Sequence, residues 1–343
     1  MSPKTLRTAR DLVDAGLAPA ERLPELERVA AQYAVTITPA MLELIEAPDD
    51  AIARQFVPTE AEFNLRPEES GDPIGDFIHS PLEGIVHRYP DRCLLKLNHA
   101  CAVYCRFCFR REMVGPEGLR PLSSNALDAA MTYIAQHTDI WEVIITGGDP
   151  FILSPRRLRE VMGRLTSIAH VKVVRFHTRV PAVAPEMITD QLVASLQAAG
   201  KAVYVALHAN HAREMTPAAR AACAKIVDAG VPMLSQTVLL AGINDDPQTL
   251  GALMRAFVET RIKPYYLHQA DLAPGTSHLR TSIEEGQILM RAMRGTVSGL
   301  CQPTYILDIP GGYGKVPIGP DYITDGGIED PAGRRHPYPP KAC

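Results

Sequence analysis

The chain has 343 residues, of which 46% are hydrophobic and 22% charged, and its formal net charge is −4 at pH 7. This composition is typical of a folded globular protein and excludes a disordered or collagen-like chain. The lack of a basic surplus argues against a direct nucleic-acid partner, and no apolar stretch approaches the ~20 residues that span a bilayer. We therefore expect a cytoplasmic protein without a membrane partner.

The first 80 residues predict a helical region that ends in a connector. Apolar residues recur at helical spacing over Thr5–Ala18, Ala20–Tyr33 and Thr38–Ala53, and proline residues separate these segments. The segment Phe63–Ser80 is rich in proline, glycine and acidic residues, with weak periodicity. We expect it to be irregular.

From Arg92 onward, short apolar runs alternate with helical segments. The predicted strands are Cys93–Leu97, Glu142–Thr146, Lys172–His177, Ala202–Leu207, Met233–Leu239 and Pro264–Gln269. The predicted helices are Asn125–Gln136, Pro155–Thr166, Pro185–Ala199, Thr216–Ala229, Pro247–Thr260 and Ser282–Thr296. Such alternation favours a parallel sheet with helices outside, and six units fall short of the eight of a complete barrel. We predict an α/β fold with an N-terminal helical region over residues 1–80, a partial (β/α)6 barrel over 81–315 and an irregular tail over 316–343.

Three of the seven cysteines lie close together, directly after the first predicted strand. Cys101, Cys105 and Cys108 have CxxxCxxC spacing, so their thiolates can converge on one inorganic cluster. A tetrahedral zinc ion would need a fourth ligand, for which His99 is a candidate. A [4Fe–4S] cluster with three thiolate ligands and one open iron suits the spacing better.

This cysteine spacing at the first βα loop resembles that of the radical S-adenosylmethionine (SAM) superfamily. The resemblance implies that the open iron binds the methionine part of SAM. One electron, from a donor such as flavodoxin or ferredoxin, then yields a 5′-deoxyadenosyl radical. The second predicted strand ends in Gly147, Gly148 and Asp149, which match the stretch that holds the methionine amino group. Glycines let the backbone approach a ligand closely, and a carboxylate attracts an ammonium.

Longer motifs narrow the resemblance to the lysine 2,3-aminomutase family. They include "HSPLEGIVHRYPDRCLLKL", "SQTVLLAGIND", "KPYYLHQADLAPGTSHLRT" and "RGTVSGLCQPTYILDIPGGYGK". The match extends from about Asp72 to Tyr322. It implies an isomerase that moves the α-amino group of L-lysine to C3, through the 5′-deoxyadenosyl radical and an aldimine of pyridoxal 5′-phosphate (PLP).

The same resemblance implies which residues bind PLP. Lys315 in "GGYGK" matches the lysine that forms the aldimine, and a buried pocket can depress the pKa of such an amine. Arg88 and Arg92 in "HRYPDR" match arginines that hold the cofactor phosphate, and we expect Arg179 to join them. Guanidinium groups are well suited to bidentate phosphate contacts.

The substrate and SAM pockets follow in the same way. Arg110 matches the residue that binds the substrate carboxylate. Asp271 and Asp308 match the two acids that bind the ε-ammonium of lysine, and two carboxylates around one ammonium select a cationic side chain. His208 and Gln236 correspond to residues that contact SAM, although a histidine at the end of an apolar strand can equally be a core residue.

The sequence also departs from the better-known aminomutases. His268 stands where those enzymes usually carry a tyrosine near the pyridoxal ring. The "YYLH" stretch resembles the branch that makes (R)-β-lysine for the modification of elongation factor P, whereas "ILDIPGGYGK" resembles the stand-alone enzymes. The sequence therefore leaves two fates open for β-lysine: release into general metabolism, or use by the lysyl ligase of elongation factor P. A homo-oligomer is a further expectation.

Three other functions also stay open. An aminomutase for another amino acid would not depend on Asp271 and Asp308. A radical enzyme that modifies a protein or an RNA would not need Lys315. A non-catalytic iron–sulfur or zinc-binding module would need only the cysteines.

Overall fold

The computed structural model describes residues 4–114, 121–197, 200–325 and 327–339. Over these residues the chain forms a large sheet in which nine strands follow one another in sequence order. Their bounds are β1 Ile85–Tyr89, β2 Arg92–Asn98, β3 Glu142–Gly147, β4 Val173–Thr178, β5 Ala202–His208, β6 Met233–Leu239, β7 Ile262–Gln269, β8 Thr304–Ile309 and β9 Gly314–Pro317. Strands β2 to β8 run parallel, and β1 and β9 pair antiparallel with them at the two edges.

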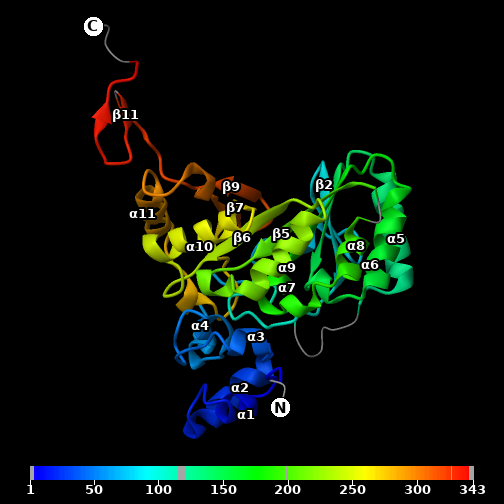
Figure 1. Cartoon of the computed structure of the whole chain (residues 1–343), viewed down its shortest axis with the longest axis horizontal. Helices are drawn as coiled ribbons and strands as arrows, with labels where there is room; N and C mark the ends of the chain where they lie inside the picture. The colour runs from blue at the N-terminus through cyan, green and yellow to red at the C-terminus, as the bar shows by residue number, and fades with distance from the viewer. Residues whose placement is uncertain (1–3, 115–120, 198–199, 326, 340–343) are drawn as a thin grey trace.

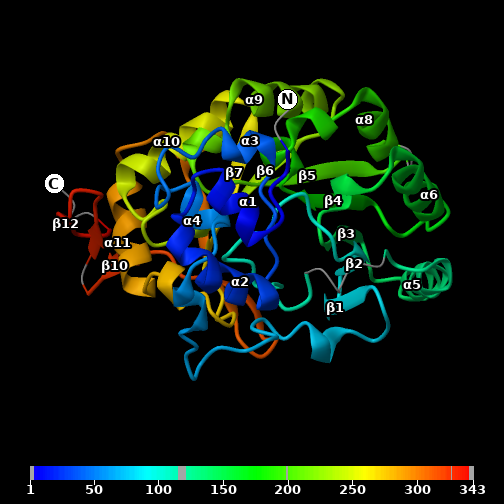
Figure 2. The ribbon, with the colours of Figure 1, turned by 90° about the horizontal axis from the view of Figure 1, so that it is seen from below.

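Helices follow the parallel strands and lie around the outside of the sheet, as Figure 1 and Figure 2 show. Their bounds are α5 Ser124–Gln136, α6 Pro155–Thr166, α7 Val180–Val183, α8 Asp190–Leu196, α9 Pro217–Asp228, α10 Pro247–Glu259 and α11 Ile283–Met293. Ser154, Thr216 and Asp246 each cap the first turn of the helix that follows, and each is followed by proline. None of the helices in the described ranges combines the length and the hydropathy that a membrane span requires.

The predicted partial (β/α)6 barrel is confirmed, and strands β2 to β7 lie where the apolar runs predict them. The sequence analysis missed β1, β8 and β9. The predicted helix Pro185–Ala199 is wrong in its first part, because Pro185–Met187 forms a single 3₁₀ turn and α8 begins only after the capping residue Thr189. Its last two residues, 198 and 199, lie outside the described residues.

The two edges of the sheet come together at one seam. The backbone N–H of Lys315, on β9, donates a hydrogen bond of 2.7 Å to the hydroxyl oxygen of Tyr89, at the end of β1. Gly314 has φ +96°, and a Cβ at this position would lie 3.0 Å from the same hydroxyl. A glycine is therefore required where β9 passes the end of β1.

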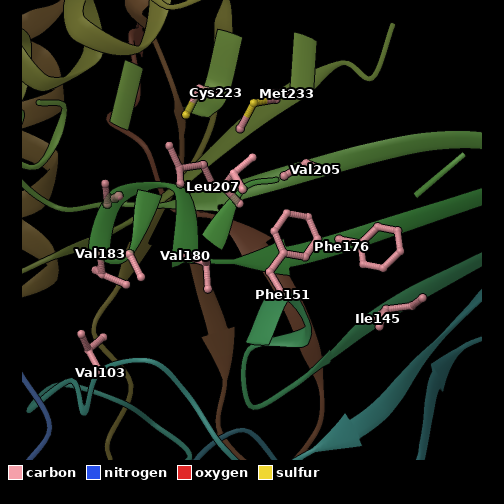
Figure 3. Packing of buried hydrophobic residues seen from close by; sticks show 14 of the residues in the cluster. Val103, Ile145, Phe151, Phe176, Val180, Val183, Val205, Leu207, Cys223 and Met233 are labelled. Atoms are coloured by element: carbon pink, nitrogen blue, oxygen red, sulfur yellow. The ribbon is translucent and has the colours of Figure 1, made fainter. Parts of the chain in front are cut away.

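Strands and helices share one hydrophobic core that also includes the N-terminal region. Phe151, just after β3, and Phe176, on β4, have ring centroids 5.6 Å apart and interplanar tilt 52°. Figure 3 shows both rings within the packed cluster. Large aromatic side chains contribute much of the buried apolar area in such a core. They fix the ends of β3 and β4, from which the glycine-glycine-aspartate stretch and Arg179 project.

The N-terminal region packs against the barrel (Figure 1). Its helices are α1 Ala9–Asp14, α2 Leu23–Gln32, α3 Pro39–Leu42 and α4 Ala53–Phe56. The predicted helix Thr38–Ala53 is wrong, since only its first turn is helical. The Thr38 hydroxyl donates to the carbonyl oxygen of Val183 at 2.5 Å, which ties this region to the barrel instead.

The tail contains a small antiparallel sheet that the sequence did not predict. Its strands are β10 Ile323–Thr324, β11 Gly327–Glu329 and β12 Arg335–His336. Arg291 of α11 pairs with Glu329 at 2.6 Å and so holds this sheet against the barrel. Residues 326 and 340–343 of the predicted tail lie outside the described residues.

Candidate active site

A cavity of about 480 Å³ extends along the inner face of the sheet toward the carboxyl ends of the strands. Such ends, with the loops that follow them, carry the active site in barrel enzymes. All candidate site residues from the sequence line this one cavity: Arg88, Arg92, Cys101, Cys105, Cys108, Arg110, Gly147, Gly148, Asp149, Arg179, His208, Gln236, Asp271, Asp308 and Lys315. His99, the alternative zinc ligand, does not line it.

The cysteine loop after β2 is held by a buried ion-pair network. The carboxylate of Glu62 pairs with the guanidinium groups of Arg106 and Arg111, and all three side chains are 0% exposed. The N–H of Thr59 donates to Glu62 at 2.9 Å. Burial opposes ionisation of Glu62, but the two arginines outweigh it and hold its pKa below the ordinary value. The N-terminal region thus fixes the loop that carries the cysteines.

Burial raises the pKa of all three cysteine thiols, that of Cys108 to about 11. Arg179 Nη1 donates to Cys105 Sγ at 2.9 Å and opposes this rise. Within the described ranges, no three His, Cys, Asp or Glu side chains are arranged to hold a single metal ion. An iron–sulfur cluster does not require the three side chains to meet at one metal ion, since each thiolate binds a separate iron.

The structure places Arg179 beside the cysteines and not among the contacts of Arg88. Its Nη2 donates to Glu214 at 2.7 Å and to Gln55 at 2.5 Å. Glu214 is fully buried, so Arg179 neutralises it. The Nη1 and Nη2 donors of Arg179 thus contact the cysteine side of the cavity, and its contact with the cofactor phosphate stays a prediction.

The glycine-glycine-aspartate stretch packs directly against the start of the cysteine loop. A Cβ at Gly147 would lie 2.5 Å from the carbonyl oxygen of Asn98, and one at Gly148 would overlap the carbonyl of Ala100. The N–H of Gly148 donates to Asn98 O at 2.7 Å, and that of Asp149 to Ala100 O at 2.8 Å. The glycines are therefore needed for this close approach of two backbones.

The Asp149 carboxylate is fully used within the protein. One oxygen accepts from the Thr178 hydroxyl at 2.7 Å and from the N–H of Phe151 at 3.0 Å. The other accepts from the N–H groups of Arg179 and Val180 at 2.7 and 3.2 Å. Burial raises its pKa, and these hydrogen bonds oppose the rise. Asp149 thus links β3 to the end of β4, and its contact with a ligand ammonium stays a prediction.

Three imidazoles from strands β4, β5 and β7 line the cavity. His177, His208 and His268 each have a buried Nε2 without a hydrogen-bond partner among the described residues. Burial lowers the pKa of all three, that of His208 to about 4, and a hydrogen bond with Gln236 opposes the shift at His208. The rings are neutral at pH 7, and their free nitrogens can donate to or accept from a bound ligand.

On the β1 and β9 side of the cavity, Asp308 contacts two residues that are predicted to bind PLP, Arg88 and Lys315. It pairs with Lys315 Nζ through one oxygen and with Arg88 Nη1 through the other, the latter at 2.8 Å. Arg92 lies nearer the surface, with its guanidinium 3.8 Å from the ring centroid of Tyr89 and paired with Asp91 at 2.6 Å.

The two predicted ammonium-binding acids differ in their surroundings. Asp308 is fully paired, whereas the Asp271 carboxylate has no hydrogen-bond or ion-pair partner within the described residues. Burial raises the pKa of Asp271 to about 7, Lys315 opposes the rise and the charge of Asp308 adds to it. Asp271 is thus a carboxyl group in the cavity wall with unused acceptor capacity.

Sequence reasoning missed the residues that support these side chains. They are Gln55, Glu62, Asp76, His177 and Glu214. The Thr59–Glu62 spacing of a capping box was a visible signal for Glu62, and the structure confirms that box. No pattern in the sequence indicates Asp76, which pairs with Arg88 at 3.1 Å and with Arg110 at 2.8 Å.

Comparison with known proteins identifies the class of this chain. The family model described as "Radical SAM superfamily" matches residues 95–253, and the model described as "Lysine-2,3-aminomutase" matches residues 290–329. The chain is 38% identical over 291 residues to the L-lysine 2,3-aminomutase of Acetoanaerobium sticklandii, covering 84% of this chain and 70% of the relative. It is 38% identical over 308 residues to that of Methanococcus maripaludis, covering 89% and 71%. The glutamate 2,3-aminomutase of Clostridioides difficile is 36% identical over 306 residues, covering 89% and 72%.

The partial barrel, the three-cysteine loop and these matches define a radical SAM enzyme. Within that superfamily the chain belongs to the lysine 2,3-aminomutase family and is an isomerase. Its cofactors are those of the family, a [4Fe–4S] cluster, SAM and PLP.

The residues present fit all three cofactors. The thiols of Cys101, Cys105 and Cys108 reach the cavity from one loop, as an iron–sulfur cluster requires. His208, whose buried Nε2 has no hydrogen-bond partner among the described residues, offers a hydrogen bond to SAM. On the β1 and β9 side of the cavity, Lys315 supplies a primary amine and Arg88 a guanidinium, the groups that a pyridoxal aldehyde and its phosphate need.

Proposed function

We propose that this enzyme moves the α-amino group of L-lysine to C3 and so interconverts L-α-lysine and β-lysine. The observation that carries the proposal is the position of Asp271 and Asp308 in the same cavity as Arg110 and Lys315. An amino-acid substrate with its carboxylate at Arg110 would direct its side chain toward the two acids.

The charges of this cavity favour a cationic side chain. Asp308 binds a primary alkylammonium, that of Lys315, which has the same chemistry as the end of a lysine substrate. Asp271 offers a second carboxylate whose acceptors are unused. The side chain of glutamate would instead meet like charge, which costs about 4 kcal/mol at 4 Å and an effective dielectric constant of 20.

Each residue has a defined task in this proposal. Arg110 binds the α-carboxylate, while Asp271 and Asp308 fix the ε-ammonium and with it the distance from the reacting carbons. The cluster with SAM supplies one-electron hydrogen abstraction, and PLP supplies a carbonyl that binds amino groups. Lys315 would hold PLP through its amine, and Asp308, which pairs with that amine here, would then be available to the substrate ammonium. The cavity walls hold the reacting groups in fixed positions relative to one another.

The test is an anaerobic assay of the reconstituted enzyme with L-lysine, SAM, PLP and a reductant. β-Lysine formed without net consumption of SAM supports the proposal, and turnover of L-glutamate in place of L-lysine contradicts it. Asp271→Asn and Asp308→Asn should each raise the KM for lysine at least tenfold, the effect of about 1.4 kcal/mol. Asp128→Asn, which changes a surface aspartate on α5, is the control and should leave turnover unchanged.

The route of the product forms a further part of the proposal. We propose that a flavodoxin or ferredoxin supplies the electron and that the "YYLH" stretch marks an enzyme that provides (R)-β-lysine for elongation factor P. Chiral chromatography of the product tests this route. An (R) product supports it, and an (S) product contradicts it.

A further inference from the structure

Asp76 connects two arginines that the sequence analysis assigned to different ligands. Its Oδ1 accepts from Arg88 Nη2 at 3.1 Å, and its Oδ2 accepts from Arg110 Nη2 at 2.8 Å. Its side chain is 3% exposed, and those of the two arginines are 8% and 9% exposed. One buried carboxylate therefore lies between the predicted phosphate contact and the predicted substrate contact.

The two arginines depend on Asp76 to different degrees. Arg88 also donates to Asp308 at 2.8 Å and to the carbonyl oxygen of Ile74 at 2.6 Å. Arg110 has no other hydrogen-bond acceptor for its guanidinium among the described residues, and its buried Nε has no partner. Its remaining contact is with the ring of Phe109, 4.4 Å from the guanidinium carbon. The orientation of Arg110 is thus set by Asp76, whereas that of Arg88 is not.

Asp76 is itself held in place by the connector that precedes β1. Its backbone N–H donates to Asp72 Oδ1 at 2.7 Å, and its carbonyl oxygen accepts from the Ser80 hydroxyl at 2.8 Å. A Cβ at the neighbouring Gly75 would overlap the backbone of Gly312, so the connector packs tightly against the glycine loop that leads to β9. A carboxylate presented in this way is well placed to orient a flexible arginine.

The charge around Asp76 favours its ionised form. Burial opposes ionisation, but Arg110, Lys96 and Arg88 outweigh it and hold the pKa of Asp76 below its ordinary value. Asp76 is therefore an anion at pH 7. It forms a charge-assisted hydrogen bond with Arg110, which is stronger and more directional than a neutral one.

We propose that Asp76 is a positioning residue that orients Arg110 toward the α-carboxylate of the substrate. This rests on the proposed function in one respect, that Arg110 binds the carboxylate of an amino acid. Because Arg88 keeps two other acceptors, loss of the Asp76 charge should weaken binding of the amino acid far more than binding of PLP. A residue with a merely structural role would weaken both together.

The test compares two affinities in Asp76→Asn and in the unaltered enzyme. PLP binding is titrated by absorbance. Binding of L-lysine to the PLP-loaded enzyme is measured by calorimetry without SAM, so that no turnover is needed. Loss of a hydrogen bond to a charged group should raise the Kd for lysine at least tenfold, with the Kd for PLP changed by about threefold or less. Asp128→Asn is the matched control, since it removes a carboxylate from an exposed arginine pair.

The opposite results would overturn the inference. A lysine Kd within about threefold of the unaltered value, or equal losses for lysine and PLP, would show that Asp76 does not orient Arg110. Asp76→Glu keeps the charge but moves it by one methylene, and an intermediate lysine affinity is expected. If Asp76→Asn fails to fold, the same comparison in Asp76→Glu decides the matter, because an unchanged lysine affinity contradicts the inference.

A wrong substrate assignment can be distinguished from a wrong role for Asp76. If the unaltered enzyme binds another amino acid and not lysine, the substrate assignment is wrong. The comparison is then made with that amino acid, since every α-amino acid carries the carboxylate that Arg110 would bind.

Discussion

Arg179 Nη1 donates a hydrogen bond to the thiol of Cys105 at 2.9 Å. The same guanidinium pairs with Glu214, a fully buried carboxylate on the loop after β5. A buried cation thus lies directly beside one of the three cysteines that are predicted to bind the cluster. Since added electrons make a cluster more negative, this cation should stabilise the reduced state.

Replacement of Arg179 tests this relationship. Arg179→Gln leaves Glu214 buried without its cation, which should cost about 3–5 kcal/mol in the free energy of unfolding. The reduction potential of any cluster that forms should fall. Denaturant titration and anaerobic redox titration measure the two effects. Arg164→Gln, which removes an exposed pair with Asp128, should change the stability by less than about 1 kcal/mol.

Gly148→Ala should reduce binding of the iron–sulfur cluster without preventing the protein from folding. The added methyl group would overlap the carbonyl of Ala100, so the start of the cysteine loop must move. We expect a folded protein with a lower iron content after reconstitution, measured as iron per polypeptide. Gly163→Ala on α6 meets nothing within 4 Å and should raise the stability by about 1 kcal/mol with full iron content. Equal iron in both variants would contradict the prediction.

Glu62→Gln should destabilise the protein in a pH-dependent way. It leaves Arg106 and Arg111 buried without a counter-charge, which should cost about 3–5 kcal/mol at pH 7. The folded-state pKa of Glu62 lies below its ordinary value of 4.5, so its contribution to stability is present above that value and is lost as the pH falls through the folded pKa. The variant and the unaltered enzyme should therefore converge in stability in acid. Urea unfolding at several pH values measures this, and a constant difference would contradict it.

Asp271 should make substrate affinity depend on pH near neutrality. Burial raises its pKa to about 7, so the group loses its charge as the pH falls below that value. A protonated carboxyl binds an ammonium weakly, and the KM for lysine should rise as the pH drops from 8 to 6. Asp271→Asn should have a high KM without this dependence. A profile with the same slope in both enzymes would show that another group causes it.

The sequence predicted the parts of the site that depend on local pattern. The cysteine spacing, the stretch Gly147–Asp149 and the strands β2 to β7 are each readable within a few residues. Strand β8, Thr304–Ile309, which carries Asp308, was missed although it has β-branched residues typical of a strand.

Apart from the capping box that includes Glu62, no sequence pattern indicates the supporting residues, because their partners are distant in the chain. Glu62 lies 44 positions from Arg106, and Asp76 lies 34 positions from Arg110. In the sequence both acids resemble solvated charges in a polar connector. The protein partners of Arg179 were missed for the same reason, since Glu214 is 35 positions away and Cys105 is 74.

The seam between β1 and β9 bears on the order in which the site can form. The contact between Tyr89 and Lys315 spans 226 positions, whereas that between Glu62 and Arg106 spans 44. Contacts of low sequence separation close with less loss of chain entropy and become available earlier during synthesis. The cysteine loop can therefore gain its buried ion pairs while the strand that carries Lys315 has yet to leave the ribosome. Assembly of the iron–sulfur half of the enzyme then does not have to wait for the pyridoxal half.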